Sequence, residues 1–535
     1  MTSGGVLLGE AASAAFIRGV EQMLSLVALT LGPGGGQVLV RSPIDDRGYR
    51  VLEDAADVTR AVVALPDPWE NMGAMYVRHV AWRVAQAVGD GAATAVVVFG
   101  TILLEVHRLV RAGHDPQRLA EAMRSYLPSV CSYLERMARP LDGQRQLVGI
   151  SETACRDRGL AELVAEALRV LGPRAALEVL SGYGARDKLQ LLQGSHWRGS
   201  GLLLPRIEAP GGAELAEPAI ALTDLEVRDP KDLAPAVVAA RQLGAHSLVL
   251  LANEVTEEAL PWLLAAEQGE GLPTVVARTP GGTSQEQMDA LWDLAHLTGG
   301  RPLLRVTGAT LRGLTATDLG RARRCRVDRD GFGVLGGRGD VRQLCAHVDW
   351  LAGRLGSSKE PEDRERYRWR LGRLTGCSGA IMVGGHAGEI DLRKGRARKA
   401  IRAAQLALES GVLPGGGVAL LRCAHHLWAL GDLEGEESRR AICRAMARAL
   451  RSPCHHIVQS AGLEPGPTLA VMAAESGDIG VDMRVGKSVD MWEASVLDPL
   501  PVQRTALQIA VGAAADAVAI CALVRPTRPQ VSVVP

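Results

Sequence analysis

Hydrophobic residues recur at three- and four-residue intervals through the first third of the chain. The first such stretch covers residues 10–31 and stops at a glycine-rich run, 32–36. A second covers 69–88, breaks at an acidic glycine turn at 89–91, and resumes through residue 112 with apolar residues on most sides. This spacing predicts helices, of which the last is buried on most of its surface. Further helices are predicted over 116–137 and 159–171.

The middle of the chain alternates short β-rich runs with helical patterns, which is typical of an α/β domain. The predicted strands cover 247–252, 274–277 and 302–306, and the predicted helices cover 232–243, 257–267 and 285–297. After residue 379 the helical pattern returns over 395–408, 415–430, 437–461 and 503–523. We therefore predict a multidomain α plus α/β protein in which helical first and last thirds bracket an inserted middle domain.

Composition agrees with a folded multidomain protein. The 535 residues exceed what one hydrophobic core usually serves, and 47% hydrophobic against 22% charged residues excludes a disordered chain. Lys plus Arg equals Asp plus Glu, so no net field steers the protein toward nucleic acid or an anionic membrane. Two arginine-rich stretches, 364–373 and 393–402, lie in helical patterns and are expected to be solvated faces.

The cysteines indicate a reducing compartment. They are nine in number, scattered, and never spaced as Cys-x-x-Cys. The sequence Cys454-His455-His456 is the densest group of soft ligands, but adjacent helical residues diverge and cannot close a zinc site. No secretory signal is recognisable at residues 1–10, and the longest apolar run, 92–104, is too short to span a bilayer. We expect a cytoplasmic protein without a membrane partner.

Four segments far apart in sequence are suited to binding a nucleotide. The run 30–36 is rich in glycine, which lets backbone N–H groups approach a phosphate, although a helix-ending turn is the better explanation of this run taken alone. The run 89–95 places Asp90 and then free amides at a helix start, where Asp90 either holds Mg²⁺ or caps the helix. The others are 413–417, which opens a helix, and Asp498 within 496–499.

The order of these motifs resembles the group I (GroEL-type) chaperonins along nearly the whole chain. The matching segments are 29–33, 70–74, 89–95, 297–300, 413–420 and 496–499. The resemblance implies a helical equatorial domain from both chain ends (1–136 and 411–535), an intermediate hinge domain (137–192 and 377–410) and an apical α/β domain (193–376). It also implies rings of identical subunits, ATP and Mg²⁺ as cofactors, non-native polypeptides as clients, and a co-chaperonin lid.

Carried over by resemblance, the nucleotide site combines residues from both ends of the chain. The implied contacts are Thr30, Leu31, Gly32 and Pro33 near the purine and α-phosphate, Asp90 on Mg²⁺, Gly91 and Thr94 at the phosphates, and Gly416 and Asp498 on the ribose and base side.

The hydrolytic residues depart from the family pattern. Two family threonines are Ala92 and Ala93 here, which removes two hydroxyl donors worth roughly 1.5–3 kcal/mol each. A family lysine is matched by Glu53, whereas the catalytic carboxylate next to it is kept as Asp54. The usual catalytic aspartate falls on Lys399, which cannot accept a proton from water. The nearest upstream carboxylate, Asp391, lies about 12 Å away along a helix, at 1.5 Å per residue.

The resemblance also assigns an apolar surface for clients in the apical domain. The best matches are Trp197, Leu202, Leu203, Leu204, Val237, Val238, Leu260 and Leu264. Pro205 and Arg206 replace an aromatic pair, and Ala234 replaces a larger residue, which predicts a narrower range of clients. The same apolar side chains are equally explained as core, because periodicity does not distinguish a core face from a binding face.

Three functions are compatible with these residues. The first is a specialised chaperonin-like assembly factor, in its own ring or in a mixed ring with a conventional chaperonin, with weakened or lost ATP hydrolysis. The second is a fully active ATP-driven folding cage that uses a rearranged carboxylate. The third is a structural or interaction oligomer that kept the fold and lost chaperone activity.

Overall fold

The described residues of the computed structural model form two compact units. They are 5–41, 49–182, 184, 186–192, 194–201, 212–256, 259, 272–328, 331–358, 360–376, 378–386, 389–474, 478–483 and 486–525. The first unit consists of Met1–Glu166, Ser181–Asp187 and Val383–Pro535, and the second of Ala167–Leu180 and Lys188–Met382. One unit therefore contains both chain ends. The segments predicted to form an intermediate domain are divided between the units, so the three-domain partition stays a prediction.

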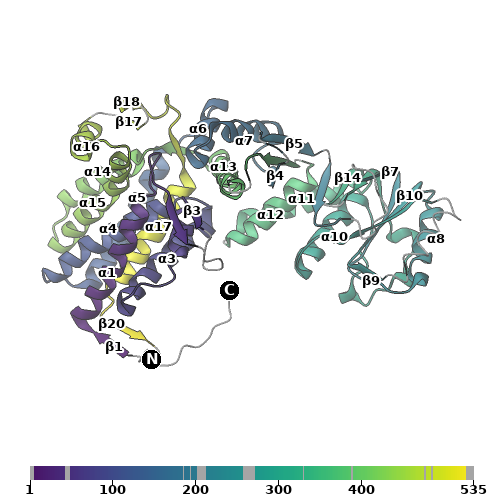
Figure 1. The fold of residues 1–535 in the computed structure, drawn as a ribbon, viewed down its shortest axis with the longest axis horizontal. Coiled ribbons are helices and arrows are strands. Elements are labelled where there is room, and N and C mark those ends of the chain that lie inside the picture. The colour runs from purple at the N-terminus through teal and green to yellow at the C-terminus, as the bar shows by residue number, and fades with distance from the viewer. Residues whose placement is uncertain are drawn as a thin grey trace. The chain divides into compact units, whose positions relative to one another are not determined.

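The first unit is a helical bundle (Figure 1). Its helices are α1 (Gly9–Ala28), α2 (Ala55–Ala61), α3 (Pro68–Val88), α4 (Ala92–Arg111), α5 (Pro116–Met137), α6 (Gly143–Cys155), α13 (Ile390–Ser410), α14 (Val418–Leu433), α15 (Glu437–Ser460), α16 (Pro465–Ala474) and α17 (Leu500–Ala517). Helix α7 (Arg158–Leu171) begins in this unit. The predicted patterns correspond to α1, α3, α4, α5, α7, α13, α14, α15 and α17, although α13 begins five residues earlier than expected and α17 ends at Ala517 rather than at residue 523. Helices α2, α6 and α16 were not predicted.

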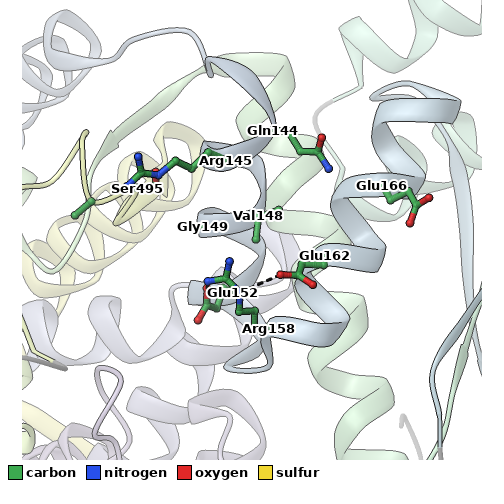
Figure 2. Close-up of a pocket in the computed structure, with 10 residues that line it drawn as sticks. Gln144, Arg145, Val148, Gly149, Glu152, Arg158, Glu162, Glu166 and Ser495 are labelled. Carbon is green, nitrogen blue, oxygen red and sulfur yellow. Dashed lines mark hydrogen bonds and ion pairs between the residues drawn. The ribbon is translucent and has the colours of Figure 1, made fainter.

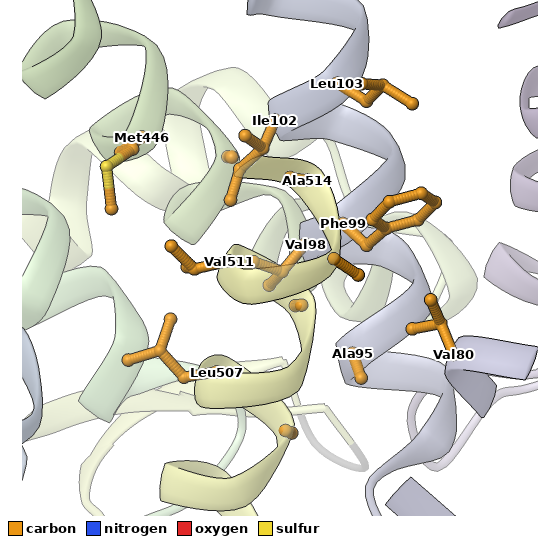
Figure 3. Packing of buried hydrophobic residues seen from close by; sticks show 14 of the residues in the cluster. Val80, Ala95, Val98, Phe99, Ile102, Leu103, Met446, Leu507, Val511 and Ala514 are labelled. Carbon is orange, nitrogen blue, oxygen red and sulfur yellow. The ribbon is translucent and has the colours of Figure 1, made fainter. Parts of the chain in front are cut away.

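Helix α4 is the centre of the first core. Val96, Val97, Val98 and Phe99 are consecutive and all buried, so this part of the helix is covered on every side, whereas Arg108 and Arg111 near its end are exposed. Its neighbours are α1 and α3 from the first third of the chain and α15 and α17 from the last third, and Figure 3 shows side chains from both groups around it. Among the described helices, α4 alone has the length and apolar composition of a membrane span.

Helices α1 and α3 cross so closely that two glycines are required. A Cβ at Gly19 would overlap the backbone oxygen of Glu70, and a Cβ at Gly73 would overlap that of Phe16. The Glu70 carboxylate binds Arg18 Nε at 2.6 Å and Gln22 Nε2 at 2.7 Å on α1. The segment 70–74, noted above as a motif, therefore joins two helices by close backbone packing.

Short strands tie distant parts of the first unit together. Strands β1 (Gly5–Leu8) and β20 (Ala522–Arg525) pair antiparallel near the two chain ends, β2 (Val38–Arg41) pairs with β3 (Tyr49–Leu52), and β16 (Val412–Pro414) pairs with β19 (Leu497–Pro499). A further hairpin joins β17 (Ile479–Asp482) and β18 (Lys487–Asp490).

The second unit contains a seven-stranded mixed sheet. Its order is β12 (Thr274–Arg278), β10 (Ser247–Ala252), β8 (Pro218–Leu222), β13 (Gly320–Val327), β14 (Gly331–Gly337) and β6 (Ser195–Arg198), with β7 (Ala213–Ala216) also on β13. A three-stranded sheet contains β4 (Ala176–Ser181), β15 (Ser378–Val383) and β5 (Lys188–Leu192), and β9 (Glu226–Val227) pairs with β11 (Glu254–Val255).

The large sheet is buried on both faces at β10, whose residues are all buried. Leu248 and Leu250 pack in one cluster with α8 (Ala234–Gln242), whereas Val249 and Leu251 pack in another with α10 (Ser284–Thr298). Alternate side chains of a strand point to opposite faces, so the one apolar run of β10 contributes side chains to both clusters.

The arginine-rich stretch 364–373 corrects one prediction, because it is not a solvated face. It lies on α12 (Pro361–Leu374), beside α11 (Val341–Ser357), and Arg368 and Arg370 are 4% and 6% exposed. Arg370 donates to Asp293 on α10 through Nε at 2.9 Å and Nη2 at 2.7 Å. His347 Nε2 lies 2.7 Å from the same carboxylate. Buried charges require such partners, and the partners come from another helix.

Two other predicted elements need comment. The strand expected over 302–306 is instead an isolated parallel bridge between Leu303 and Thr223, followed by a 3₁₀ turn, Arg305–Thr307. The end of the helix expected over 503–523 is β20, which pairs with β1 at the other end of the chain. The helix expected over 257–267 lies outside the described residues, apart from Ala259.

We expect Arg370→Ala to lower the free energy of unfolding of the second unit by about 3–5 kcal/mol, because it leaves the buried charge of Asp293 without its main partner. Amide hydrogen exchange of α10 and α12 at increasing urea concentrations measures this unit separately. The exposed Arg342→Ala on α11 is the control, and equal losses in both variants would contradict the prediction.

Candidate functional site

The third and fourth predicted segments are joined by a β-ladder in the first unit. Asp498 on β19 pairs with Leu413 on β16, and the N–H of Gly415 donates to the backbone oxygen of Val496 at 2.8 Å. Gly416 and Gly417 follow with φ of 62° and 80°, a left-handed conformation that favours glycine. Residues 413–417 and 496–499 therefore form one structural element.

The end of α15 connects this element to the first segment. A Cβ at Gly417 would lie 2.9 Å from Cys454 Cα, and one at Gly32 would lie 3.2 Å from Ser460 Oγ. Leu31 packs in a cluster with Ile457 of α15. The loop that contains Thr30, Leu31, Gly32 and Pro33 thus lies against the same helix as Gly417.

The second segment lies beside the fourth. Gly89 and Gly91 have φ of 76° and 83°, and Asp90 forms the turn between α3 and α4. A Cβ at Gly91 would lie 2.7 Å from Val502 Cγ1 at the start of α17, four residues after Asp498. The N-cap of α4 is Gly91, without a side-chain capping bond, so Asp90 is not the helix cap. Its Oδ1 accepts a bond from the N–H of Gly91 at 2.8 Å.

Asp90 lies close enough to Asp498 to affect the ionisation of Asp498. Burial, and then the negative charge of Asp90, raise the pKa of Asp498 to about 7, although Gln503 Nε2 donates to its carboxylate at 2.8 Å. Near neutral pH this carboxyl group is therefore only partly ionised. Thr94 lies in the first turn of α4, and the neighbouring Ala92 and Ala93 carry no hydroxyl groups.

Lys399 on α13 lies among the acidic residues of the site. Its ammonium forms an ion pair with Asp54, the N-cap of α2, which also accepts bonds from the N–H groups of Ala56 and Asp57. Burial opposes the charged form of Lys399, but the charges of Asp90 and Asp54 outweigh it and raise its pKa. Burial likewise opposes the charged form of Asp54, but Lys399 and the two amides hold the pKa of Asp54 below its ordinary value.

Glu53 forms a second ion pair with the same helix. Arg396 binds it through Nη2 at 2.6 Å and Nε at 3.0 Å, and Gln37 Nε2 donates to it at 2.6 Å. Burial works to raise the pKa of Glu53, but these hydrogen bonds and the charges of Arg396 and Arg156 lower it overall. The exposed alternative carboxylate, Asp391, pairs with Lys394 instead.

Arg156 reaches the first predicted loop from the turn between α6 and α7. Its Nη2 donates to the backbone oxygens of Gly32 at 2.9 Å and Thr30 at 3.0 Å. Neither Arg156 nor Arg396 was among the predicted site residues. A signal for Arg396 was present, because Arg393, Arg396 and Lys399 recur every three residues and so share one face of a helix. For Arg156 the sequence offered no comparable pattern.

Most predicted client-binding residues fall outside the described part of the chain. These are Leu202, Leu203, Leu204, Leu260 and Leu264, together with Pro205 and Arg206. On α8, Val238 is 53% exposed, whereas Val237 packs in the core with Leu248 and Leu250. Trp197 is also fully buried. The positions of Val237 and Trp197 correct the expectation that these two side chains face a client.

A pocket of about 490 Å³ lies elsewhere in the first unit (Figure 2). It is lined by Gln144, Arg145, Val148, Gly149, Glu152, Arg158, Glu162, Glu166, Ala494 and Ser495. Arg158 pairs there with Glu162 at 2.9 Å and Glu152 at 3.7 Å. None of the predicted nucleotide residues contributes to it.

The residues near α4 fit a phosphate group better than they fit its hydrolysis. The α4 N-terminus offers amides without a side-chain cap and a favourable dipole. Asp90 stands next to it and carries the carboxylate oxygens that would hold Mg²⁺, an ion that neutralises phosphate charge when bound. The Lys399 ammonium lies near Asp90 and offers no acceptor for a proton.

In the helical unit, glycine loops from both ends of the chain lie beside a helix N-terminus. An α/β unit is inserted into the sequence of this helical unit. This combination is typical of a multidomain protein with an anion-binding type of site. The chain belongs to the TCP-1/cpn60 chaperonin family, whose model matches residues 23–232 and 242–526. The resemblance to chaperonins is therefore confirmed, whereas membership of group I stays a prediction. Members of this family assist protein folding, bind non-native polypeptides as rings, and generally depend on ATP and Mg²⁺.

The raised pKa of Asp498 predicts a pH-dependent stability. A carboxyl group that binds its proton more tightly when folded contributes stability that is complete below its unfolded pKa, near 4, and is lost as the pH rises through about 7. Each unit of pKa shift corresponds to about 1.4 kcal/mol of folding free energy, and screening by solvent lowers this value. Between pH 4 and 8 we therefore expect the free energy of unfolding of Asp498→Asn to fall by about 1–3 kcal/mol less than that of wild type.

Urea unfolding followed by circular dichroism at several pH values measures this effect. Asp516→Asn is the matched control, since this exposed residue lies on α17 and forms only a surface pair with Arg124. A wild-type profile identical to that of Asp498→Asn would contradict the prediction.

Proposed function

We propose that this protein is a chaperonin-like assembly factor that binds non-native polypeptides in a cytoplasmic ring and hydrolyses ATP slowly or not at all. The observation that carries the proposal is the ion pair of Lys399 with Asp54. By resemblance, Lys399 occupies the position of the catalytic aspartate and Asp54 is the second catalytic carboxylate. The ammonium therefore neutralises one catalytic carboxylate and replaces the other.

The chemical consequence follows from the donor set. An ammonium donates three hydrogen bonds and accepts none, so Lys399 cannot orient or deprotonate an attacking water. Loss of a positioned base typically costs about 10²- to 10⁴-fold in rate. Nucleotide binding by Thr30, Leu31, Gly32, Pro33, Asp90, Gly91, Thr94, Gly416 and Asp498, with Mg²⁺ on Asp90, remains part of the proposal.

Exposed apolar strands support the proposed ring. Leu39 and Tyr49 on the β2–β3 hairpin are each 65% exposed, and Leu8 and Val524 on the β1–β20 pair are 65% and 60% exposed. Within the described residues, β1 and β20 pair only with each other and therefore leave outer edges. Unpaired strand edges with apolar side chains are typical sites for another chain. We propose another subunit as the partner, either identical or a conventional chaperonin.

The second unit is the proposed client-binding part. Val238 offers an exposed apolar side chain on α8. By resemblance, Leu202, Leu203, Leu204, Leu260 and Leu264 also bind the client, and a co-chaperonin lid is the further partner. The smaller residue Ala234, at the start of α8, is in keeping with a narrow range of clients.

Single-turnover phosphate release from ring-sized fractions tests the catalytic part of the proposal. We expect wild type to release no more phosphate than Asp90→Ala. Lys399→Asp should raise release by about tenfold, less than the full 10²- to 10⁴-fold contribution of a base, because Ala92 and Ala93 still lack hydroxyl groups. Wild-type release well above that of Asp90→Ala would instead favour an active ATP-driven cage.

Light scattering with and without ATP-Mg²⁺ tests the assembly. We expect Leu39→Lys to dissociate the ring, because it places a charge on an apolar hairpin. Leu433→Lys is the matched control, since Leu433 is 85% exposed at the end of α14.

The same fractions should suppress aggregation of a denatured client. A defined oligomer without preference for unfolded chains would favour the structural or interaction role, and a wild-type monomer that suppresses no aggregation would remove the proposal.

A further inference from the structure

The face of α13 that carries Arg393, Arg396 and Lys399 is bound to acidic residues from separate parts of the first unit. The three cations recur every three residues, so they lie along one side of the helix over about 9 Å, at 1.5 Å per residue. We call these three residues the cationic stripe. Each of them contacts a carboxylate outside α13.

Arg393 forms the first connection. Its Nη2 lies 2.7 Å from Asp187 Oδ2 and 3.1 Å from Asp157 Oδ2, which precedes α7. Burial opposes the charged form of Arg393, but the two aspartates outweigh it and raise its pKa. One guanidinium group therefore joins α13 to two segments that are thirty residues apart in sequence.

Arg396 and Lys399 form the second connection, to the segment that opens α2. Arg396 binds Glu53 through two nitrogens, a geometry that fixes orientation as well as distance. Lys399 binds the next residue, Asp54. Two adjacent carboxylates are thus bound by two cations one helical turn apart.

The charges at this connection are the reverse of those implied by the family resemblance. The resemblance places a cation at Glu53 and a carboxylate at Lys399, and such a carboxylate beside Asp54 and Asp90 requires a cation from elsewhere. Here the cation is built into the chain, and the charge of Asp90 is the strongest attraction on Lys399. Glu53 and Asp54 therefore each have a cationic partner within the chain, without a ligand.

We propose that the cationic stripe is a nucleotide-independent clasp, in which Lys399 supplies the positive charge near Asp54 and Asp90 and α13 stays bound to α2 when no nucleotide or Mg²⁺ is present. This inference rests on the proposed function for the identity of the site and concerns its regulation. Partial burial makes these pairs less sensitive to salt than exposed pairs, since the side chains of Glu53 and Asp187 are only 11% and 13% exposed.

Amide hydrogen exchange of the full chain without nucleotide tests the clasp. We expect Lys399→Met to raise exchange in α2 and in the facing part of α13 by about tenfold, because the pair with Asp54 is lost. Arg398→Met, the exposed neighbour on the same helix, should leave exchange unchanged. Addition of Mg²⁺ and ADP should change wild-type exchange in α2 by less than about twofold.

A charge exchange between Glu53 and Arg396 separates the ion pair from general damage to the fold. Glu53→Arg and Arg396→Glu should each raise exchange in α2, and the double variant should restore protection, because the pair is re-formed with opposite polarity. Failure of the double variant to restore protection, or a tenfold gain in wild-type protection with Mg²⁺ and ADP, overturns the clasp.

The experiment uses neither a client nor turnover. If the protein shows the expected exchange but releases phosphate rapidly, the clasp is supported and the proposed function is contradicted. If phosphate release is slow but the exchange differs from that expected, only the clasp is contradicted.

Discussion

The burial of α4 on every side between Val96 and Phe99 is the constraint on which the first unit depends. A helix with consecutive buried residues from Val96 to Phe99 cannot be covered by its sequence neighbours alone, and here α15 and α17 complete the cover that α1 and α3 begin. Both ends of the chain must therefore fold together. Because α4 begins two residues after Asp90 and α17 two residues after Asp498, the same packing brings these two carboxyl groups into one site.

The site that results is unusual in its charges. Lys399 lies near Asp54 and Asp90, and Asp90 in turn lies near Asp498. Their ionisation differs: Asp498 holds its proton to about pH 7, whereas Asp54 stays ionised because it has a cationic partner. Such divergence among neighbouring acids is typical of functional sites. In this protein the difference in pKa between Asp498 and Asp54 comes from residues of the chain itself. We therefore propose a role in binding and assembly rather than in rapid hydrolysis.

Ion pairs play a related part in the second unit. Asp293 is 1% exposed and binds Arg370 and His347, so the helices α10, α11 and α12 are held by charges as well as by apolar packing. The two arginine-rich stretches of the sequence thus both form ion pairs within the fold, each in a separate unit. Each stretch pairs with acidic residues that lie far away in sequence. Both were predicted to be solvated faces because those acidic partners could not be recognised from the sequence.

The sequence by itself determined the helices, the α/β character of the middle and the chaperonin family, because periodicity, glycine turns and motif order are local or ordered along the chain. The resemblance also identified Lys399 as a departure from the family pattern. Only the tertiary structure decided that Lys399 meets Asp54, that Arg156 binds the loop at Thr30, and that Val237 is core while Val238 is exposed. Those outcomes depend on which faces of distant helices come together, and side-chain spacing within one segment carries no information about the segment that will face it.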